Sequence, residues 1–233
     1  MRNFIFIFIL LSVQGMESAY SQENKERGQK PSQEMTAVSF AMQLARFGYE
    51  NDKPIYLLSA AQTLIDNPIK GEFKLTNIEI IGKADTSSQN PKRKKVSINI
   101  NSLIADAIKL ADNDSSIINL AYKIEKESHS DQVAKNRGRK YSPLVKEITL
   151  YSNSNIALQT VFNAKEIAEV FVMGEGSAPL NLTVYDQNGT IIKTNPSTPD
   201  NCYISFTPKT TGNYKIEIKN VGKSKNDLLL MTN

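Results

Sequence analysis

The chain has 233 residues, of which 40% are hydrophobic and 22% are charged, so it has the composition of a globular protein with a sizeable core. Its 28 lysines and arginines against 24 acidic residues give a formal net charge of +4, and it contains one histidine, one cysteine and no tryptophan. The single histidine and single cysteine exclude sites that need two imidazoles, a thiolate cage for zinc or an intrachain disulfide.

Residues 1–21 have the pattern of a signal peptide. Arg2 supplies a positive charge, an apolar stretch follows at residues 4–13, and small residues stand at the two positions that signal peptidase reads before Gln22. The apolar stretch reaches only about half of the ~30 Å hydrocarbon layer of a membrane. We therefore expect cleavage before Gln22 and an exported bacterial protein of the periplasm, the cell surface or the secreted fraction, with no transmembrane segment after cleavage.

Residues 22–33 are polar and predict a flexible tail, and residues 34–127 predict a helical region. In the helical region, apolar residues recur about every 3.6 positions in two pairs of segments, which is typical of two helical hairpins. Asp52 and Ser102 are the expected N-caps of the second and third helices, and Asn67 is expected to end the second because a proline follows it. The pairs resemble tetratricopeptide-type hairpins weakly, without the ~34-residue repeat of that family, so the sequence predicts a four-helix cluster.

Period-two alternation marks the segments that are expected to form strands. The segments 73–80 and 95–100 alternate in part and predict a small β-hairpin within residues 73–100. Residues 128–143 are polar and basic and predict a linker, where we place the domain boundary. Residues 144–233 then contain a series of short alternating runs separated by Gly, Pro and Asn, and this spacing is typical of a β-sandwich.

The end of the chain resembles the bacterial pre-peptidase C-terminal domain. The resemblance rests on residues 180–186 (LNLTVYD), 188–189 (NG), 202–208 (CYISFTP) and 211–216 (TGNYKI). It covers roughly the last 85 to 90 residues, a size consistent with an independent domain. It implies a noncatalytic, jelly-roll-like β-sandwich of a kind commonly appended to secreted proteases and other exported enzymes. The predicted fold class is therefore a two-domain α+β protein, with helical hairpins followed by this sandwich.

Members of that family often carry an Asp-rich stretch where this chain has residues 174–181 (GEGSAPLN), which lack most of those carboxylates. Carboxylate oxygens are the main ligands of calcium in proteins, so we expect no cofactor. The alternative is a calcium ion held by Asp186, Asn188 and Asp200.

The lone histidine and the lone cysteine are poor candidates for chemistry. His129 lies in a polar segment with no predicted helix or strand to hold it in a catalytic geometry. Cys202 shares one face of an alternating run with Ile204 and Phe206, which favours a small core residue over a reactive thiol. We therefore expect no catalytic residue and no enzyme activity.

Two basic clusters carry most of the positive charge and are candidate contacts for an anionic partner, such as a phosphorylated glycan or a lipid head group. Their residues are Lys92, Arg93, Lys94, Lys95, Arg137, Arg139 and Lys140. The alternative is that they are solvated linkers that keep the chain soluble. Nucleic acid is not expected as a partner, because the chain is exported and no aromatic residues are interleaved to stack on bases.

These features together predict an exported, noncatalytic binding or scaffolding protein of the bacterial envelope, a monomer whose partner is an envelope protein or a glycan. Two alternatives stay open. One is a hydrolase whose carboxylates come together only in three dimensions, and the other is an accessory subunit of a secreted enzyme. A pocket with several carboxylates would favour the hydrolase, whereas a shallow or apolar groove between helices and sandwich would favour binding.

Overall fold

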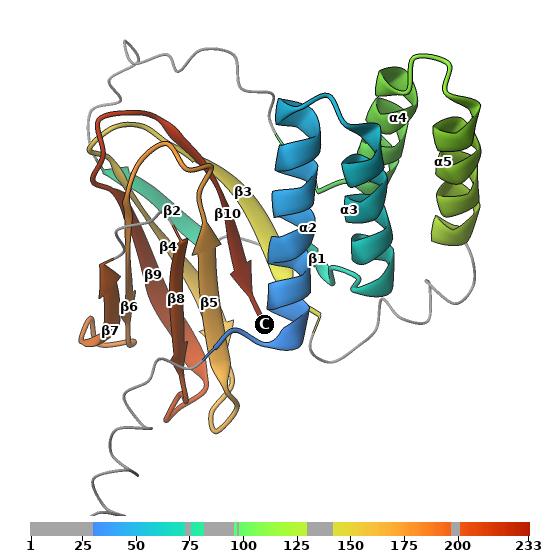
Figure 1. Cartoon of the computed structure of the whole chain (residues 1–233). Helices are drawn as coiled ribbons and strands as arrows, with labels where there is room; N and C mark the ends of the chain where they lie inside the picture. The colour runs from blue at the N-terminus through green and yellow to red at the C-terminus, as the bar shows by residue number, and fades with distance from the viewer. Residues whose placement is uncertain (1–29, 73–75, 82–95, 97, 130–141, 197–200) are drawn as a thin grey trace, which may run out of the picture. The chain divides into compact units, whose positions relative to one another are not determined.

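The computed structural model describes residues 30–72, 76–81, 96, 98–129, 142–196 and 201–233 (Figure 1). The predicted signal peptide, residues 22–29 of the predicted tail and most of the predicted basic linker lie outside these residues.

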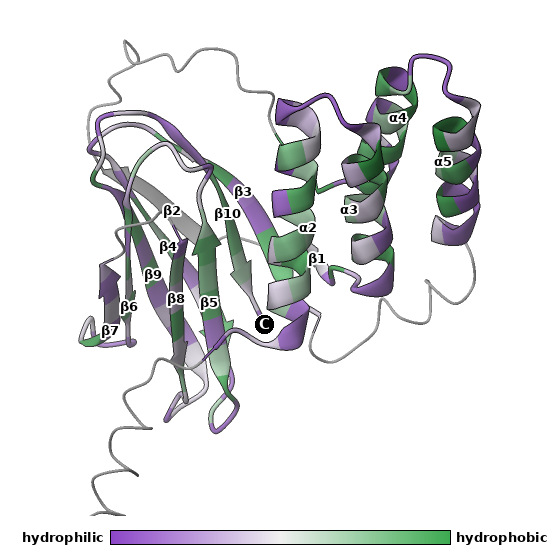
Figure 2. Cartoon of the chain, viewed as in Figure 1, coloured by the Kyte–Doolittle hydropathy of each residue, from purple (hydrophilic) through white to green (hydrophobic). Residues whose placement is uncertain are grey.

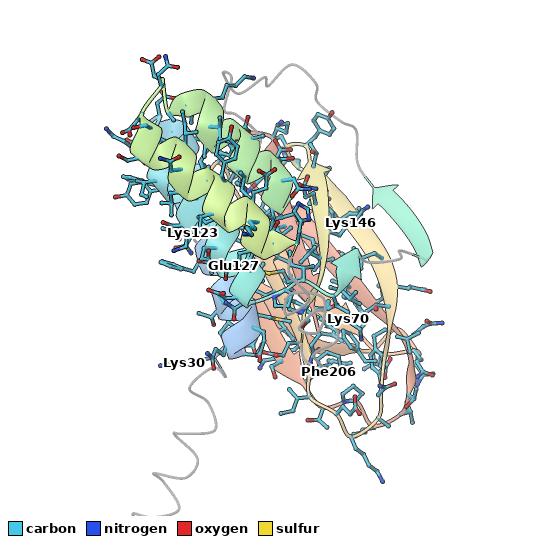
Figure 3. All side chains as sticks on the ribbon, turned by 90° about the vertical axis from the view of Figure 1, so that its right-hand side faces the viewer. Lys30, Lys70, Lys123, Glu127, Lys146 and Phe206 are labelled. Atoms are coloured by element: carbon cyan, nitrogen blue, oxygen red, sulfur yellow. The ribbon has the colours of Figure 1, made fainter. Side chains whose placement is uncertain are left out.

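Four helices are described in the N-terminal half: α2 (Gln33–Glu50), α3 (Pro54–Asp66), α4 (Ile100–Leu110) and α5 (Ser115–Ser128). The first two and the last two form the predicted hairpins, and α3 also packs against both α4 and α5, so the predicted four-helix cluster is confirmed. The outer face of α5 carries polar side chains such as Lys123 and Glu127 (Figure 3), and this polar face ends the row of helices. Among the described residues, no helix is long and apolar enough to cross a membrane.

The helix ends differ in part from the predicted caps. Asn67 is the C-cap of α3, as expected. The N-cap of α4 is Asn99, whose side chain accepts a hydrogen bond from the Ser102 N–H at 3.0 Å, because the helix begins before Ser102. The N-cap of α3 is Lys53, which makes no side-chain cap. Asp52 instead has a φ of 51° and lies in the turn between α2 and α3, so neither Asp52 nor Ser102 has the predicted role.

Two five-stranded sheets form the predicted β-sandwich. Sheet A has the order β1-β3-β10-β5-β8 and sheet B has the order β2-β4-β9-β6-β7. Neighbouring strands are antiparallel except β1 and β3, which are parallel. The strands are β1 (Gly71–Glu72), β2 (Thr76–Ile81), β3 (Leu144–Leu150), β4 (Asn155–Phe162), β5 (Ala168–Met173), β6 (Leu180–Tyr185), β7 (Ile191–Pro196), β8 (Asn201–Phe206), β9 (Gly212–Asn220) and β10 (Asn226–Thr232). Helical hairpins followed by a β-sandwich are thus the architecture that the sequence predicts.

The segment between the two helical hairpins contributes an edge strand to each sheet. β1 pairs with β3, and β2 pairs with β4. The predicted hairpin within residues 73–100 is therefore wrong: the first segment contains β2, which pairs with the sandwich, and Ile100 begins α4. An isolated two-stranded ribbon is marginally stable, whereas the edge of an existing sheet offers a row of free hydrogen-bonding groups.

Sheet A is buried on both faces where α2 crosses it. Every residue of β5 is buried, and four consecutive residues are apolar in each of the two strands, residues 170–173 of β5 and residues 228–231 of β10. Both strands are green over part of their length in Figure 2. Alternate side chains belong to two different apolar clusters, which is the pattern of a strand covered on both sides. Val170, Val172, Leu228 and Leu230 belong to the interior of the sandwich. The residues of sheet A whose side chains pack with α2 and the other helices are Val145, Phe171, Met173, Leu229 and Met231.

This helical cover joins the two predicted parts of the chain. Met35, Val38, Met42 and Ala45 of α2 share one apolar cluster with the outer face of sheet A. Residues 31–233 accordingly form one compact unit. The molecule has three layers in this region, with sheet A between sheet B and the helices (Figure 1).

Candidate functional site

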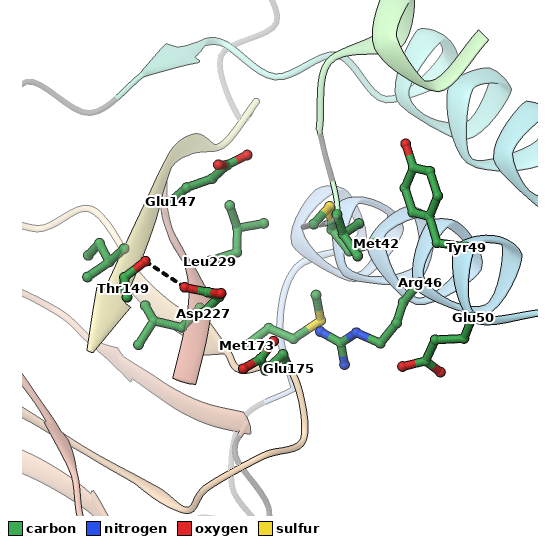
Figure 4. A pocket seen from close by; sticks show the side chains of 13 residues that line it. Met42, Arg46, Tyr49, Glu50, Glu147, Thr149, Met173, Glu175, Asp227 and Leu229 are labelled. Carbon is green, nitrogen blue, oxygen red and sulfur yellow. Dashed lines mark hydrogen bonds between the residues drawn. The ribbon is translucent and has the colours of Figure 1, made fainter. Parts of the chain in front are cut away.

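A cavity of about 490 Å³ opens between α2 and the outer face of sheet A (Figure 4). We call it the α2 pocket. One wall is formed by α2, and the other by β3, β10 and the segment that follows β5.

The register of sheet A explains where this pocket forms. Val145 of β3 lies opposite Met231 of β10, and both are buried under the helices. Two residues further along β3, Glu147 lies opposite Leu229. After another two residues, Thr149 lies opposite Asp227. The outer face of sheet A thus changes from apolar to polar along the strands, and α2 does not pack closely on the polar end because carboxylates need water or partners.

The α2 wall contributes an arginine and a tyrosine that are fixed by hydrogen bonds. The Arg46 Nη2 donates to the carbonyl oxygen of Gly174 at 2.8 Å, which ties α2 to the end of β5. Its Nε is buried and has no hydrogen-bond partner among the residues that the structure describes. The Tyr49 hydroxyl donates to Asp106 Oδ2 of α4 at 2.7 Å. Burial raises the pKa of Tyr49, and the hydrogen bond to Asp106 and the charge of that carboxylate raise it further, so the hydroxyl stays protonated.

Four carboxylates from separate parts of the chain line the same pocket: Glu50, Glu147, Glu175 and Asp227. Glu50 is exposed, and the other three are half-buried. Glu50 lies one helical turn after Arg46, a spacing at which opposite charges on a helix attract each other. The pocket therefore collects carboxylates that are far apart in the sequence.

Asp227 and Glu175 make hydrogen bonds with neighbouring side chains. Asp227 forms an ion pair with Lys225 at 2.7 Å and accepts a hydrogen bond from the Thr149 hydroxyl. The hydrogen bond to Asp227 raises the pKa of Lys225. Glu175 accepts a hydrogen bond from the Ser177 hydroxyl at 3.1 Å. Among the described residues, the cations at the pocket are Arg46, which lines it, and Lys225, which pairs with Asp227.

The floor of the pocket is apolar. Met42 from α2 and Met173 and Leu229 from sheet A line it, and all three are buried in the cluster that joins helices and sheet. Methionine side chains adapt to ligands of different shape. The pocket thus combines an apolar floor with an acidic rim. Such a site can hold an organic cation, since carboxylates accept charge-assisted hydrogen bonds from ammonium or guanidinium groups and the floor receives an attached hydrocarbon chain.

The structure places the residues singled out from the sequence away from this pocket. Asp186 Oδ1 accepts the backbone N–H groups of Asn188 and Thr190 at 2.9 and 2.8 Å, so this carboxylate stabilises the turn between β6 and β7. Asp200, the third residue of the calcium alternative, lies outside the described residues. The part of the chain that the structure describes contains no group of three or more His, Cys, Asp or Glu side chains that could hold a metal ion.

The two basic clusters, Lys92, Arg93, Lys94, Lys95, Arg137, Arg139 and Lys140, also lie outside the described residues, and their role as contacts for an anionic partner stays a prediction. His129 is exposed at the C-terminal end of α5. Cys202 is fully buried in the interior of the sandwich, and its Sγ donates to the Leu180 carbonyl oxygen at 3.3 Å, which confirms it as a core residue.

The pocket carboxylates were not among the candidate residues from the sequence. They lie on α2, β3, β10 and the segment after β5, so only the strand register and the packing of α2 on sheet A bring them together. The alternating residues Val145, Glu147 and Thr149 carried the available signal, because an outward face that turns polar within one strand indicates where a covering element ends.

Comparisons with known proteins find similar chains among solved structures. No family model matches the chain, and no curated protein matches it. Among solved structures, the chain is similar to the pre-peptidase C-terminal domain of a collagenase from Bacillus anthracis, with 9% identity and a TM-score of 0.34 over 38% of this chain and 87% of that chain. It is also similar to PliG of Aeromonas hydrophila, a periplasmic inhibitor of g-type lysozyme, with 15% identity and a TM-score of 0.31 over 39% and 83% of the two chains.

A family 35 carbohydrate-binding module from Clostridium thermocellum is similar as well, with 19% identity and a TM-score of 0.22 over 39% of this chain and 91% of that chain. The pre-peptidase C-terminal domain, which the sequence resembles, is thus also a structural neighbour.

Proposed function

We propose that the protein is an exported, noncatalytic binding protein of the bacterial envelope and that its α2 pocket binds an organic cation. The observation that carries the proposal is the gathering of four carboxylates around an apolar floor. A primary ammonium or guanidinium group at the rim would exchange water for charge-assisted hydrogen bonds, and its hydrocarbon chain would lie against the floor formed by Met42, Met173 and Leu229.

The carboxylates of the α2 pocket also raise the alternative of a carboxylate-dependent hydrolase. A catalytic acid at neutral pH requires a carboxyl group that is removed from water, so that it keeps its proton. Here Glu50 is exposed, Glu147 and Glu175 are half-buried, and Asp227 is paired with Lys225. The arrangement therefore favours electrostatic binding over acid–base catalysis.

The test compares a cation with a neutral molecule of nearly the same shape. We expect n-butylguanidinium to bind in a chemical-shift titration, and n-butylurea to bind about tenfold more weakly or not at all, because only the former carries charge. Glu147→Gln and Glu175→Gln should each weaken n-butylguanidinium binding by about tenfold, and added salt should weaken it as well.

Glu125→Gln is the matched control, since Glu125 lies exposed on α5 and does not line the pocket. Equal affinities for the charged and neutral probes, or unchanged affinity in the Glu147→Gln and Glu175→Gln variants, would overturn the pocket proposal.

Export is tested separately. The pattern of residues 1–21 supports removal of a signal peptide, and N-terminal sequencing of the protein from the envelope fraction of the producing cells should give Gln22 as the first residue. A full-length chain that remains in the cytoplasm would contradict export and leave the binding proposal intact.

A further inference from the structure

Next to the α2 pocket lies a group of large apolar side chains that the fold leaves exposed. We define the hairpin patch as Phe40 and Phe47 of α2 with Ile55 and Tyr56 of α3. Their exposed fractions are 52%, 47%, 41% and 37%. The rings of Phe47 and Tyr56 meet edge to face, with centroids 4.8 Å apart, so the patch continues from one helix to the next.

The patch is exposed because the other faces of α2 are already in use. Met35, Val38 and Met42 face the cluster with sheet A, and Gly48 lies against Leu57 of α3. Phe40 and Phe47 are seven residues apart, which is about two helical turns, so they share the remaining face. Isolated exposed apolar residues are ordinary, whereas two exposed aromatic rings in contact, as those of Phe47 and Tyr56 are, are typical of an interaction surface.

The patch and the pocket meet on α2. Phe47 belongs to the patch and Glu50 to the pocket, and residues three apart on a helix have Cβ atoms about 5–6 Å apart. Alternate side chains on one side of an extended peptide are about 6.6 Å apart, since each residue rises about 3.3 Å. An extended peptide could therefore place a basic side chain in the α2 pocket and an apolar side chain, two positions away, on the hairpin patch.

We infer that the partner of this protein is a polypeptide segment that inserts a lysine or arginine side chain into the α2 pocket and packs a nearby aromatic or aliphatic side chain on the hairpin patch. The inference rests on the proposed binding of a cation in the pocket and adds the class of molecule that carries the cation. A small organic cation would fill the pocket and leave the patch exposed.

The probe is the fluorescein-labelled peptide GSFSRSFSG, in which phenylalanine stands two positions on either side of one arginine. It is titrated against the mature full-length protein and compared with a citrulline version, which is neutral, and with an alanine version, which lacks both aromatic rings. We expect each replacement in the peptide to weaken binding about fivefold or more.

The protein variants separate the two sites. Phe47→Ala should weaken the peptide about fivefold and leave n-butylguanidinium binding unchanged, whereas Glu147→Gln should weaken both probes. Tyr56→Ala is a second patch variant that guards against a local effect at Phe47. Tyr122→Ala is the matched control, because Tyr122 is 56% exposed on α5 and should have no effect.

The outcomes distinguish this inference from the proposed function. If n-butylguanidinium binding depends on Glu147 but neither patch variant affects the peptide, the inference is overturned and the proposed function stands. If the patch variants weaken the peptide while Glu147→Gln changes neither probe, the pocket does not bind the cation and both fail. Binding to phosphatidylserine vesicles that is lost in Phe47→Ala, with no binding of the peptide, would identify a membrane surface and would also overturn the inference.

Discussion

Two tyrosine hydroxyls tie separate elements of the molecule together through carboxylates. Tyr203 of β8 donates to Glu169 Oε1 at 2.6 Å, and the same oxygen accepts the N–H of Ser32, at the start of α2, at 2.8 Å. Glu169 is 7% exposed, so these hydrogen bonds replace much of its hydration. Tyr49 connects α2 with Asp106 of α4 in the same manner. Hydrogen bonds to carboxylates are stronger than neutral ones, and these two lie at opposite ends of α2.

Replacing Tyr203 with phenylalanine tests the first of these contacts. The variant keeps the ring and removes one donor from the buried carboxylate of Glu169, so we expect the free energy of unfolding to fall by about 1–2 kcal/mol in urea titrations. Tyr122→Phe, which changes an exposed hydroxyl, should leave the stability unchanged. Equal stability of the Tyr203 variant and the wild-type protein would mean that Glu169 obtains sufficient hydration without it.

The same hydroxyls predict how stability depends on alkaline pH. Burial raises the pKa of both Tyr49 and Tyr203 above the ordinary value of about 10, and the hydrogen bonds to their carboxylates raise it further. Below pH ~10 both states keep these protons, and the stabilisation is complete. Above pH ~10 the unfolded state loses them first, so stability falls as pH rises. The double variant Tyr49→Phe/Tyr203→Phe should show a shallower decrease in free energy of unfolding between about pH 9.5 and 11, whereas Tyr122→Phe should keep the wild-type slope. Identical slopes would contradict the assignment.

At the scale of the element, α2 contacts both the sandwich and the next helix, and a glycine allows the second contact. A Cβ atom at Gly48 would lie 2.8 Å from Leu57 Cδ2 and 3.1 Å from the Lys53 carbonyl oxygen. Leu57 is fully buried and has little freedom to move. The close approach of α2 and α3 therefore depends on the missing side chain.

Gly48→Ala is expected to destabilise the protein by about 1–2 kcal/mol, although alanine is the better helix former by about 1 kcal/mol, because the added methyl group overlaps Leu57. A double-mutant cycle identifies the cause. In a Leu57→Ala background the space is open, and Gly48→Ala should be neutral or stabilising when thermal or urea unfolding is measured. A penalty of the same size in both backgrounds would point to the backbone instead.

The elements could be predicted from the sequence to different degrees. Strands of the sandwich that alternate between buried and half-buried residues, such as Leu180–Tyr185, were located closely because period-two patterns are local. The partner of the strand Thr76–Ile81 could not be predicted in this way. This strand pairs with β4, which follows two further helices in the chain, and pairing over such a distance has no local sequence signature. The pocket could not be predicted for the same reason, because strand pairing determines which residues line it. Glu147 and Asp227 belong to one site only through the register of β3 and β10.

For the whole molecule, the sandwich depends on the helical half in two ways. The helices cover the apolar outer face of sheet A, and the segment between the helical hairpins supplies the edge strands β1 and β2. Without them, Phe171, Met173 and Leu229 would face water together, and two sheet edges would lose their partners. Exposed apolar faces and unpaired edges both promote aggregation.

Residues 31–233 should therefore unfold in one transition, with coincident far-UV circular dichroism and tyrosine fluorescence, whereas the isolated fragment 144–233 should aggregate or stay unfolded in sedimentation and circular dichroism measurements. The double substitution Phe171→Thr/Leu229→Thr distinguishes this cause from general instability. It should make the fragment more soluble, because it lowers the hydrophobicity of the uncovered face, and it should destabilise residues 31–233, where the same face is packed against α2. A wild-type fragment 144–233 that folds as a soluble monomer would show that the sandwich is an autonomous domain and that the helices merely dock on it.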